Sequence, residues 1–237
     1  MIGRPSLRRR ELLELLYDAR YRYQSLHCRL SFELHRHRPV VQFGSRALKP
    51  FLFSDDGPSF SVWTSRSEVW LGRSWRMRVE QHNELDGKVY PAAVAFREGD
   101  RFWATGLDGR DGINEVVGVT FGFEFMLDPA RLLASFDIEP TTETKWQARN
   151  AIQARATRRP GTRGVGPAIS RHANDEYELV IDAVYGVVLE ASQTVDDVRA
   201  AHYSVNAIEF DEPLDESLFV SPSDHLDSRT SAESLPL

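Results

Sequence analysis

Apolar positions near the N-terminus first recur at helical spacing and then at strand spacing. From Leu12 to Leu26 they are mostly three or four residues apart and form one stripe, which predicts a helix over about residues 6–26. From Cys28 to Leu34 every second residue is apolar. That alternation predicts a strand with one buried face directly after the helix.

The two-residue alternation returns along most of the remaining chain. It predicts short strands at residues 60–65, 75–80, 92–96, 102–103, 121–125, 146–156, 177–181, 187–191 and 203–210. Asp128-Pro129 predicts the start of a short second helix, because Asp caps helices and Pro suits the first helical position. The predicted fold is therefore α+β, with about ten antiparallel strands in hairpin order and both helices against one face of the sheet.

Length and composition fit one soluble globular domain. The chain has 237 residues, of which 41% are hydrophobic and 27% charged, and its one cysteine excludes an intramolecular disulfide framework. No apolar run approaches the ~20 residues that cross a bilayer. We expect residues 1–220 to form a single domain and the Ser-, Asp- and Pro-rich residues 221–237 to form a disordered tail.

The N-terminal residues do not have the pattern of a secretory signal. Acidic residues interrupt the leucines that follow Arg8–Arg10, whereas a signal peptide needs an apolar core of roughly 7–15 residues and a small-residue cleavage site. The sequence as written therefore predicts a cytoplasmic protein. Export is the alternative if the start codon has been wrongly assigned.

Motifs for catalysis and for metal binding are absent from the sequence. It has neither a G-x-S-x-G nor an H-E-x-x-H segment. His35 and His37 share one strand face, but no third ligand lies near them, so an exposed strand face is the preferred interpretation. The Gly-rich loop with Asp108, Asp111 and Asn114 does not fit the spacing of an EF-hand calcium site. We therefore predict a protein that is not an enzyme and has no cofactor and no metal.

Charge is unevenly distributed along the chain. Residues 145–174 contain seven basic and no acidic residues, whereas residues 209–237 contain eight acidic residues and one Arg. The loop 158–174 within the basic segment is either a solvated loop or a contact for an anionic partner such as lipid headgroups, and the acidic tail could also fold back upon it. Trp146 alone among aromatic residues is interleaved with these charges, which argues against nucleic acid as a partner.

Several segments taken in order resemble a known family. They are Trp75–Glu80, Gly99–Trp103, Leu127–Leu133 and the closing segment Ile208–Phe219. Following an N-terminal helix, this order is similar to that of the Lol-type lipoprotein carriers and the related sigma-factor regulatory sensors, especially their actinobacterial members, over about residues 10–220. The resemblance implies a strongly curved antiparallel half-barrel, with helices closing its concave side. It also implies non-catalytic binding of acyl chains or hydrophobic peptides there. The missing export signal and the basic loop are departures from that family.

A binding face follows from the resemblance together with the aromatic content, which is 11%. Side chains on the concave face of a half-barrel could hold an apolar ligand, although the same rings could instead fill the core. The candidates for ligand binding are Trp63, Trp75, Met77, Phe96, Trp103, Phe121, Phe123 and Phe125. The sequence thus predicts a non-catalytic binding protein for an acyl chain or apolar segment. A regulatory module that recognises a protein partner is the alternative, and the oligomeric state is left open.

Overall fold

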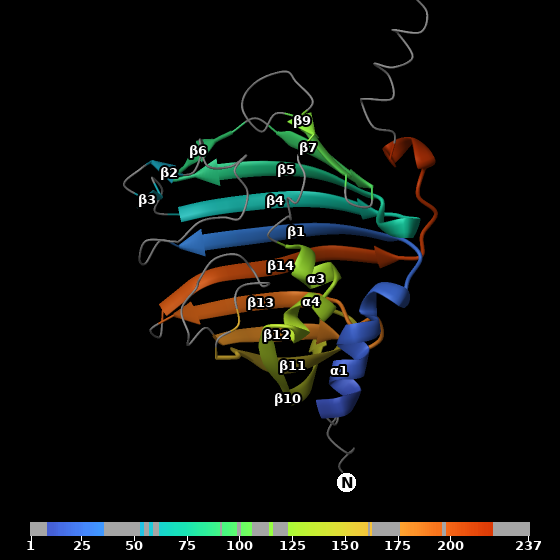
Figure 1. Ribbon diagram of the computed structural model, residues 1–237, viewed down its shortest axis with the longest axis vertical. Coiled ribbons are helices and arrows are strands. Elements are labelled where there is room, and N and C mark those ends of the chain that lie inside the picture. The colour runs from blue at the N-terminus through green and yellow to red at the C-terminus, as the bar shows by residue number, and fades with distance from the viewer. Residues whose placement is uncertain are drawn as a thin grey trace, which may run out of the picture.

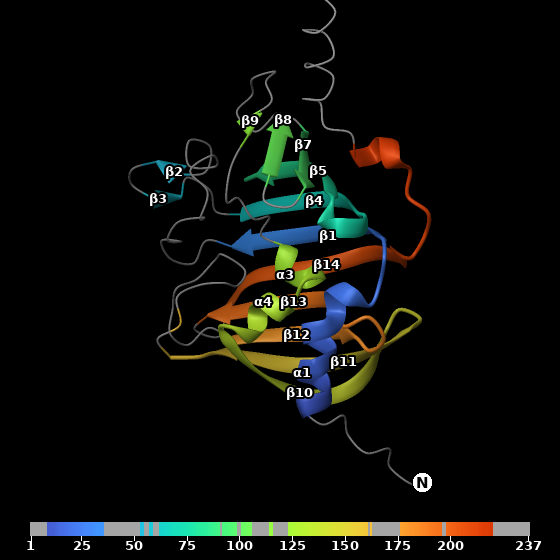
Figure 2. The same cartoon turned by 45° about the vertical axis from the view of Figure 1, so that its right-hand side comes forward.

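One curved antiparallel sheet organises the chain (Figures 1 and 2). The computed structural model describes residues 9–35, 62–90, 92–98, 123–160, 162, 176–194 and 199–219, and the backbone alone at 53–54, 57–58, 101–105, 114–115, 195 and 198. The first half of the chain contributes to this sheet β1 (Leu26–His35), β4 (Val62–Leu71), β5 (Met77–Leu85), β6 (Lys88–Val89), β7 (Ala93–Glu98), β8 (Arg101–Thr105) and β9 (Asn114–Glu115). The second half contributes β10 (Phe136–Trp146), β11 (Arg149–Arg158), β12 (Glu176–Asp182), β13 (Val188–Val195) and β14 (Val198–Phe210). A separate two-stranded ribbon pairs β2 (Phe53–Ser54) with β3 (Gly57–Pro58).

The strand order joins two meanders along a central seam. The twelve described strands run β10-β11-β12-β13-β14-β1-β4-β5-β7-β8-β9, with β6 paired to β5. The last strand, β14, returns to lie antiparallel beside the first, β1, and Phe32 there faces Tyr203. Because β9 and β10 are the two free ends of this path, the sheet is an open half-barrel. Ten of its strands have five or more residues, so the expected α+β half-barrel is confirmed.

The described helices lie on the concave face of the sheet. They are α1 (Arg9–Asp18), α3 (Glu124–Leu127) and α4 (Ala130–Leu133). In both views α1 crosses the end of the sheet formed by β10–β12, whereas α3 and α4 lie in front of the middle strands (Figures 1 and 2). No helix among the described residues is both long and apolar enough to cross a bilayer.

The N-terminal helix is shorter than its apolar stripe predicts. Leu12, Leu15 and Leu16 are buried as expected, but α1 ends at Asp18 and a 3₁₀ turn follows at Ala19–Tyr21. Leu26 is instead the first residue of β1, where it is buried within the sheet. The apolar stripe continues past the end of α1 because Leu26, at the start of β1, packs into the same core as the helix does.

Two other segments differ from the predicted elements. The alternation at 121–125 predicted a strand, but Phe123 and the four residues of α3 are all buried, so the structure here is a short helix enclosed on every side. The predicted strand 146–156 is the second arm of a hairpin, with β10 as the first arm. Gln147 has a φ of +50° in the tight turn between the two arms. A short second helix follows Asp128 as predicted, but α4 begins one residue later than expected, with Pro129 rather than Asp128 at the N-cap position and no side-chain cap hydrogen bond.

The domain boundaries stay a prediction. Residues 221–237, expected to be a tail, and residues 161 and 163–174 of the basic loop lie outside the described residues.

Cys28 provides a simple test of the core. Its side chain is 1% exposed on the concave side of β1, and burial, followed by the charge of Glu68, raises the pKa of its thiol far above the ordinary value. Because the thiolate is the reactive species, we expect the folded protein at pH 8 to react with a thiol reagent only as fast as it unfolds. Stopped-flow or manual thiol titration with and without denaturant measures this. Rapid labelling without denaturant would contradict the burial of β1.

Candidate functional site

The concave face is lined by alternating residues of six neighbouring strands. The pairing registers place Tyr177, Gln193, Ala201, Leu34, Trp63 and Leu85 in one row across the sheet. The adjacent row contains Leu179, Ala191, Tyr203, Phe32, Ser65 and Asn83. Both rows lie on the side that α1, α3 and α4 cover, because side chains two residues apart share a face.

Four aromatic rings form a continuous chain on this face. The Phe125 ring on α3 meets Tyr203 edge-on with centroids 5.1 Å apart, and Tyr203 stacks on Phe32 at 4.9 Å. Phe32 meets Trp63 edge-on at 4.8 Å. Burial raises the pKa of the Tyr203 hydroxyl well above its ordinary value, so it stays neutral. The result is an apolar surface that runs from the helical cover across β14, β1 and β4.

The cover over this surface is held by ion pairs. Glu124 on α3 is 4% exposed in its side chain and accepts from Arg97 Nη1 on β7 at 2.9 Å and from Arg131 Nη1 on α4 at 2.7 Å. Arg131 Nε also donates to Asp128 between the two helices at 3.2 Å. The Tyr23 hydroxyl donates to the carbonyl oxygen of Leu127 at 3.0 Å. These contacts join α3 and α4 to β7 and to the segment that precedes β1.

The structure places the described ligand-binding candidates in four different settings: the concave face, the helical cover, a 3₁₀ turn and the convex face. Trp63 and Met77 lie on the concave face, since β4 and β5 pair so that their faces coincide. Phe123 and Phe125 belong to the helical cover rather than to a strand. Trp75 is in the 3₁₀ turn Arg73–Trp75, where its φ is +58°, and it packs half-buried against the core.

Phe96 lies on the opposite, convex face. It pairs with Arg78, whose guanidinium is 5.2 Å from the Phe96 ring and 5.8 Å from Trp70. The alternation of Ala92, Val94 and Phe96 suggested the inner face, but the residues of β7 that face the core are its alanines. The Phe96 ring is buried on the convex face, with the Arg78 guanidinium against it. Its prediction as a concave-face residue is therefore wrong.

The last two candidates are described in part or not at all. Only the backbone of Trp103 is described, on β8 opposite Phe96, and Phe121 lies outside the described residues.

Sequence reasoning missed three residues of the concave face. Phe32 and Tyr203 were recognised as strand residues, but their stacking depends on the pairing of β1 with β14, which are about 170 positions apart in sequence. Gln193 is 0% exposed, and within the described part of the chain both its side-chain amide atoms lack a hydrogen-bond partner. The sequence signal that could have identified it was a Gln at an inward-facing position of the alternating strand β13.

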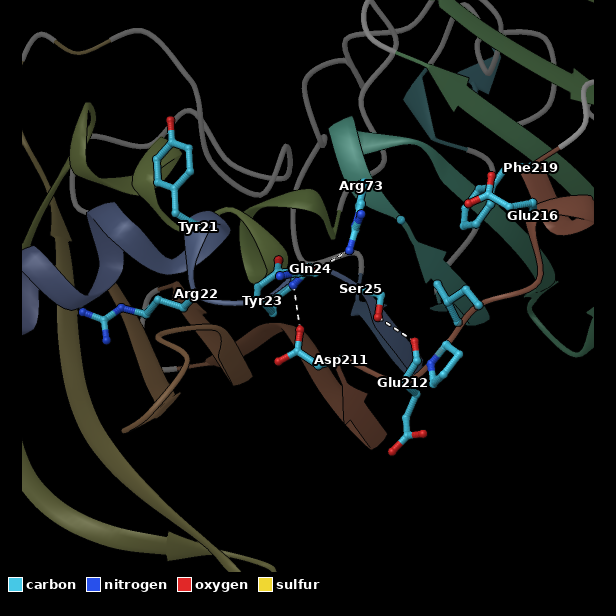
Figure 3. Close-up of a pocket in the computed structure, with 13 residues that line it drawn as sticks. Tyr21, Arg22, Tyr23, Gln24, Ser25, Arg73, Asp211, Glu212, Glu216 and Phe219 are labelled. Atoms are coloured by element: carbon cyan, nitrogen blue, oxygen red, sulfur yellow. Dashed lines mark hydrogen bonds between the residues drawn. The ribbon is translucent and has the colours of Figure 1, made fainter.

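A separate pocket of about 650 Å³ lies beside the loop that precedes β1 (Figure 3). Its lining residues are Tyr21, Arg22, Tyr23, Gln24, Ser25, Gly72, Arg73, Asp211, Glu212, Pro213, Leu214, Glu216 and Phe219. Arg73 donates to Gln24 at 2.6 Å, the backbone N–H of Gln24 donates to Asp211 at 2.7 Å, and Ser25 donates to the Glu212 carbonyl at 2.7 Å. These bonds tie the closing segment after β14 to the start of β1.

The described residues do not complete either of the metal sites considered from the sequence. Among the described residues no group of three or more His, Cys, Asp or Glu side chains is placed to hold a metal, and His35 is hydrogen-bonded to Glu33. His37 and the loop with Asp108 and Asp111 lie outside the described residues, and Asn114 is described by its backbone alone.

In the basic segment, three arginines make contacts within the fold. Arg149 pairs with Asp182 at 3.3 Å, Arg159 pairs with Asp137 at 3.0 Å, and the Arg158 guanidinium lies 4.9 Å from the Phe136 ring.

An open sheet whose apolar inner face is covered by short helices is a half-barrel, so the fold that the resemblance implied is confirmed. Among solved structures the chain is similar to MucB, with a TM-score of 0.50 and 15% identity over 90% of this chain and 62% of MucB. The chain thus spans less than two thirds of the length of MucB. Lipoprotein LppX of Mycobacterium tuberculosis aligns with 10% identity over 86% of this chain and 97% of its own, with a TM-score of 0.47. LprF from Mycobacterium bovis aligns with 11% identity over 93% and 99%, also at 0.47. No known family profile matches the chain, and no curated protein is similar to it in sequence.

Proposed function

We propose that this protein is a non-catalytic binding protein that holds an apolar ligand, an acyl chain or an apolar segment, against the aromatic concave face. The observation that carries the proposal is the nature of the cover: two four-residue helices, α3 and α4, lie over a continuous chain of aromatic rings. The ligand would occupy the side of Phe32, Trp63 and Tyr203 that the cover now protects.

Short helices make a cover that a ligand can displace. An isolated helix of one turn has no stability of its own in water, so α3 and α4 are held only by their tertiary contacts. The ion pairs of Glu124 hold them laterally to β7, and Phe125 supplies the apolar contact to the sheet. An apolar chain that replaces Phe125 on Tyr203 restores the buried area that is lost, at about 25 cal/mol per Å². Exchange of cover for ligand is therefore close to balanced in free energy.

The binding site needs no chemistry beyond contact. The rows that line the face are apolar or carry neutral groups, and the charges near it, Glu124 and Arg131 in the cover and Arg97 on β7, pair with one another. MucB has been solved in complex with MucA(peri). The predicted cytoplasmic location stays a prediction, and the presence of a lipoprotein among the similar structures gives it no support.

Loosening the cover should strengthen binding. We expect Glu124→Gln, which keeps the shape of the side chain and removes its charge, to weaken the contacts to Arg97 and Arg131 and favour the open cover. If opening becomes easier by about 1.4 kcal/mol, the apparent affinity for a fluorescent fatty acid rises about tenfold. Fluorescence titration of wild type and variant measures this.

Glu14→Gln is the matched control, because Glu14 forms an exposed pair with Arg10 on α1, away from the cover. It should leave the affinity unchanged. Native mass spectrometry of the purified protein before and after organic extraction provides an independent check, since a bound apolar molecule is lost on extraction. The proposal is refuted if neither wild type nor Glu124→Gln binds the probe saturably and no mass is lost.

A further inference from the structure

The side-chain amide of Gln193 is an unexplained polar group within the concave face. The residue is 0% exposed, and neither Nε2 nor Oε1 has a hydrogen-bond partner among the described residues. Its pairing register is regular up to this point, with Tyr177 on β12 and Ala201 on β14 beside it, so the side chain lies on the inner face. A buried amide that makes no hydrogen bond is costly, and each such group in a native structure calls for a specific cause.

The neighbours of Gln193 on the inner face are small along β13 and on β14, whereas Tyr177 lies beside it on β12. Two of the nearest positions on the inner face are alanines, Ala191 along β13 and Ala201 on β14, and both are fully buried. A glutamine side chain extends several atoms further from the sheet than an alanine does. Among the described helices, α3 packs against β13, so the amide lies on the strand that this part of the cover contacts. A ligand that displaces α3 would meet this amide.

Both atoms of the amide need partners, and this restricts the ligand. Nε2 donates and Oε1 accepts, so the complementary group must offer an acceptor and a donor side by side. An ester carbonyl accepts only and leaves Oε1 unpaired. An ionised fatty-acid carboxylate also lacks a donor and is costly to bury, and a protonated carboxyl group offers both an acceptor and a donor but occurs only once, at the end of its chain. A residue of an extended peptide presents its own C=O and N–H toward the same side, as in a strand pair that exchanges both bonds.

We infer that Gln193 is a polar anchor for the backbone of an extended apolar peptide segment bound on the concave face. This inference rests on the proposed function and narrows its ligand from any apolar chain to a peptide. The aromatic chain from Phe125 to Trp63 supplies apolar contacts, and Gln193 fixes the segment along the sheet by two hydrogen bonds.

The test substitutes Gln193→Met, which keeps the length of the side chain and removes its hydrogen bonding. Two probes are titrated by calorimetry: an N-acetylated, C-amidated octapeptide of alternating leucine and serine, and methyl palmitate. We expect the variant to lose about tenfold in affinity for the peptide and to bind methyl palmitate as wild type does. We also expect its melting temperature without ligand to rise by about 2–4 °C, because an unpaired amide has left the core.

Gln81→Met is the matched control, because Gln81 is on the same face but donates to Ser65 Oγ at 2.8 Å. Its melting temperature should fall, since a satisfied hydrogen bond is lost. A lower melting temperature for Gln193→Met, or peptide affinity that is unchanged or falls equally with that for the ester, overturns the inference and leaves the proposed function standing. If the wild-type protein binds methyl palmitate but not the peptide, the inference is likewise overturned and the proposed function stands. If wild type binds neither probe, the proposed function itself is overturned.

Discussion

Gly186→Ala should be strongly destabilising, with a fall in melting temperature of roughly 10 °C. Gly186 closes the turn between β12 and β13 with a φ of +76°, and a Cβ at this position would lie 2.5 Å from the carbonyl oxygen of Leu15 on α1. The left-handed backbone costs about 1–2 kcal/mol for alanine, and the collision adds about 1–3 kcal/mol because neither the turn nor α1 can yield cheaply. At about 2–4 °C per kcal/mol for a domain of this size, thermal unfolding followed by circular dichroism will resolve the effect.

Gly87→Ala separates the two costs. Gly87 has a similar φ of +81°, but nothing lies within 4 Å of the Cβ that alanine would add. We expect this control to lose only the backbone part, or about 3 °C. Equal melting temperatures for the two variants would mean that α1 is not docked on the turn at Gly186. Such a result would remove the close contact that positions one end of the concave face.

The period of the apolar positions was sufficient to predict the class of fold. Strands with one buried face, such as Cys28–Leu34 and Tyr177–Ile181, show a clean alternation because their other face meets solvent or polar side chains. The hairpin β10–β11 was half missed, because most of the inner arm positions beyond Ile138 are exposed or half-buried and carry polar residues. The alternation of apolar and polar residues cannot reveal a strand where its inner face extends past the core, because those positions need not be apolar.

The candidate site was less predictable, because it depends on which face each strand turns inward. A polar residue at 124 made Phe123 and Phe125 look like a strand, whereas Glu124 is buried and forms ion pairs with Arg97 on β7 and Arg131 on α4. Phe96 satisfied the alternation but faces outward, because its register pairs it with Arg78 on the convex face. Local patterns record that a side chain is buried and do not record what buries it. The partners of Phe32 and Gln193 depend in the same way on the long-range pairing of β1, β13 and β14.

The two sides of the sheet should respond differently to truncation of their aromatic rings. We expect Trp63→Leu to lower the affinity for a fluorescent fatty acid by tenfold or more, because Trp63 is 5% exposed and ends the aromatic chain through its edge-on contact with Phe32. Loss of a central aromatic contact typically costs about 2 kcal/mol or more of binding. Fluorescence titration at a temperature well below the unfolding of the variant measures the effect, and circular dichroism confirms that it is folded.

Phe96→Leu is the matched variant on the convex face. Its ring is also buried, so this substitution destabilises the fold to a comparable extent, but it lies against Arg78 and away from the proposed ligand. We expect its affinity for the probe to stay within about twofold of wild type, since a difference below about 0.4 kcal/mol changes a dissociation constant by less than that. Two variants that are equally unstable but differ in affinity would locate the ligand on the inner face. Equal losses of affinity would instead indicate that binding follows general stability, and a loss confined to Phe96→Leu would place the ligand on the convex face.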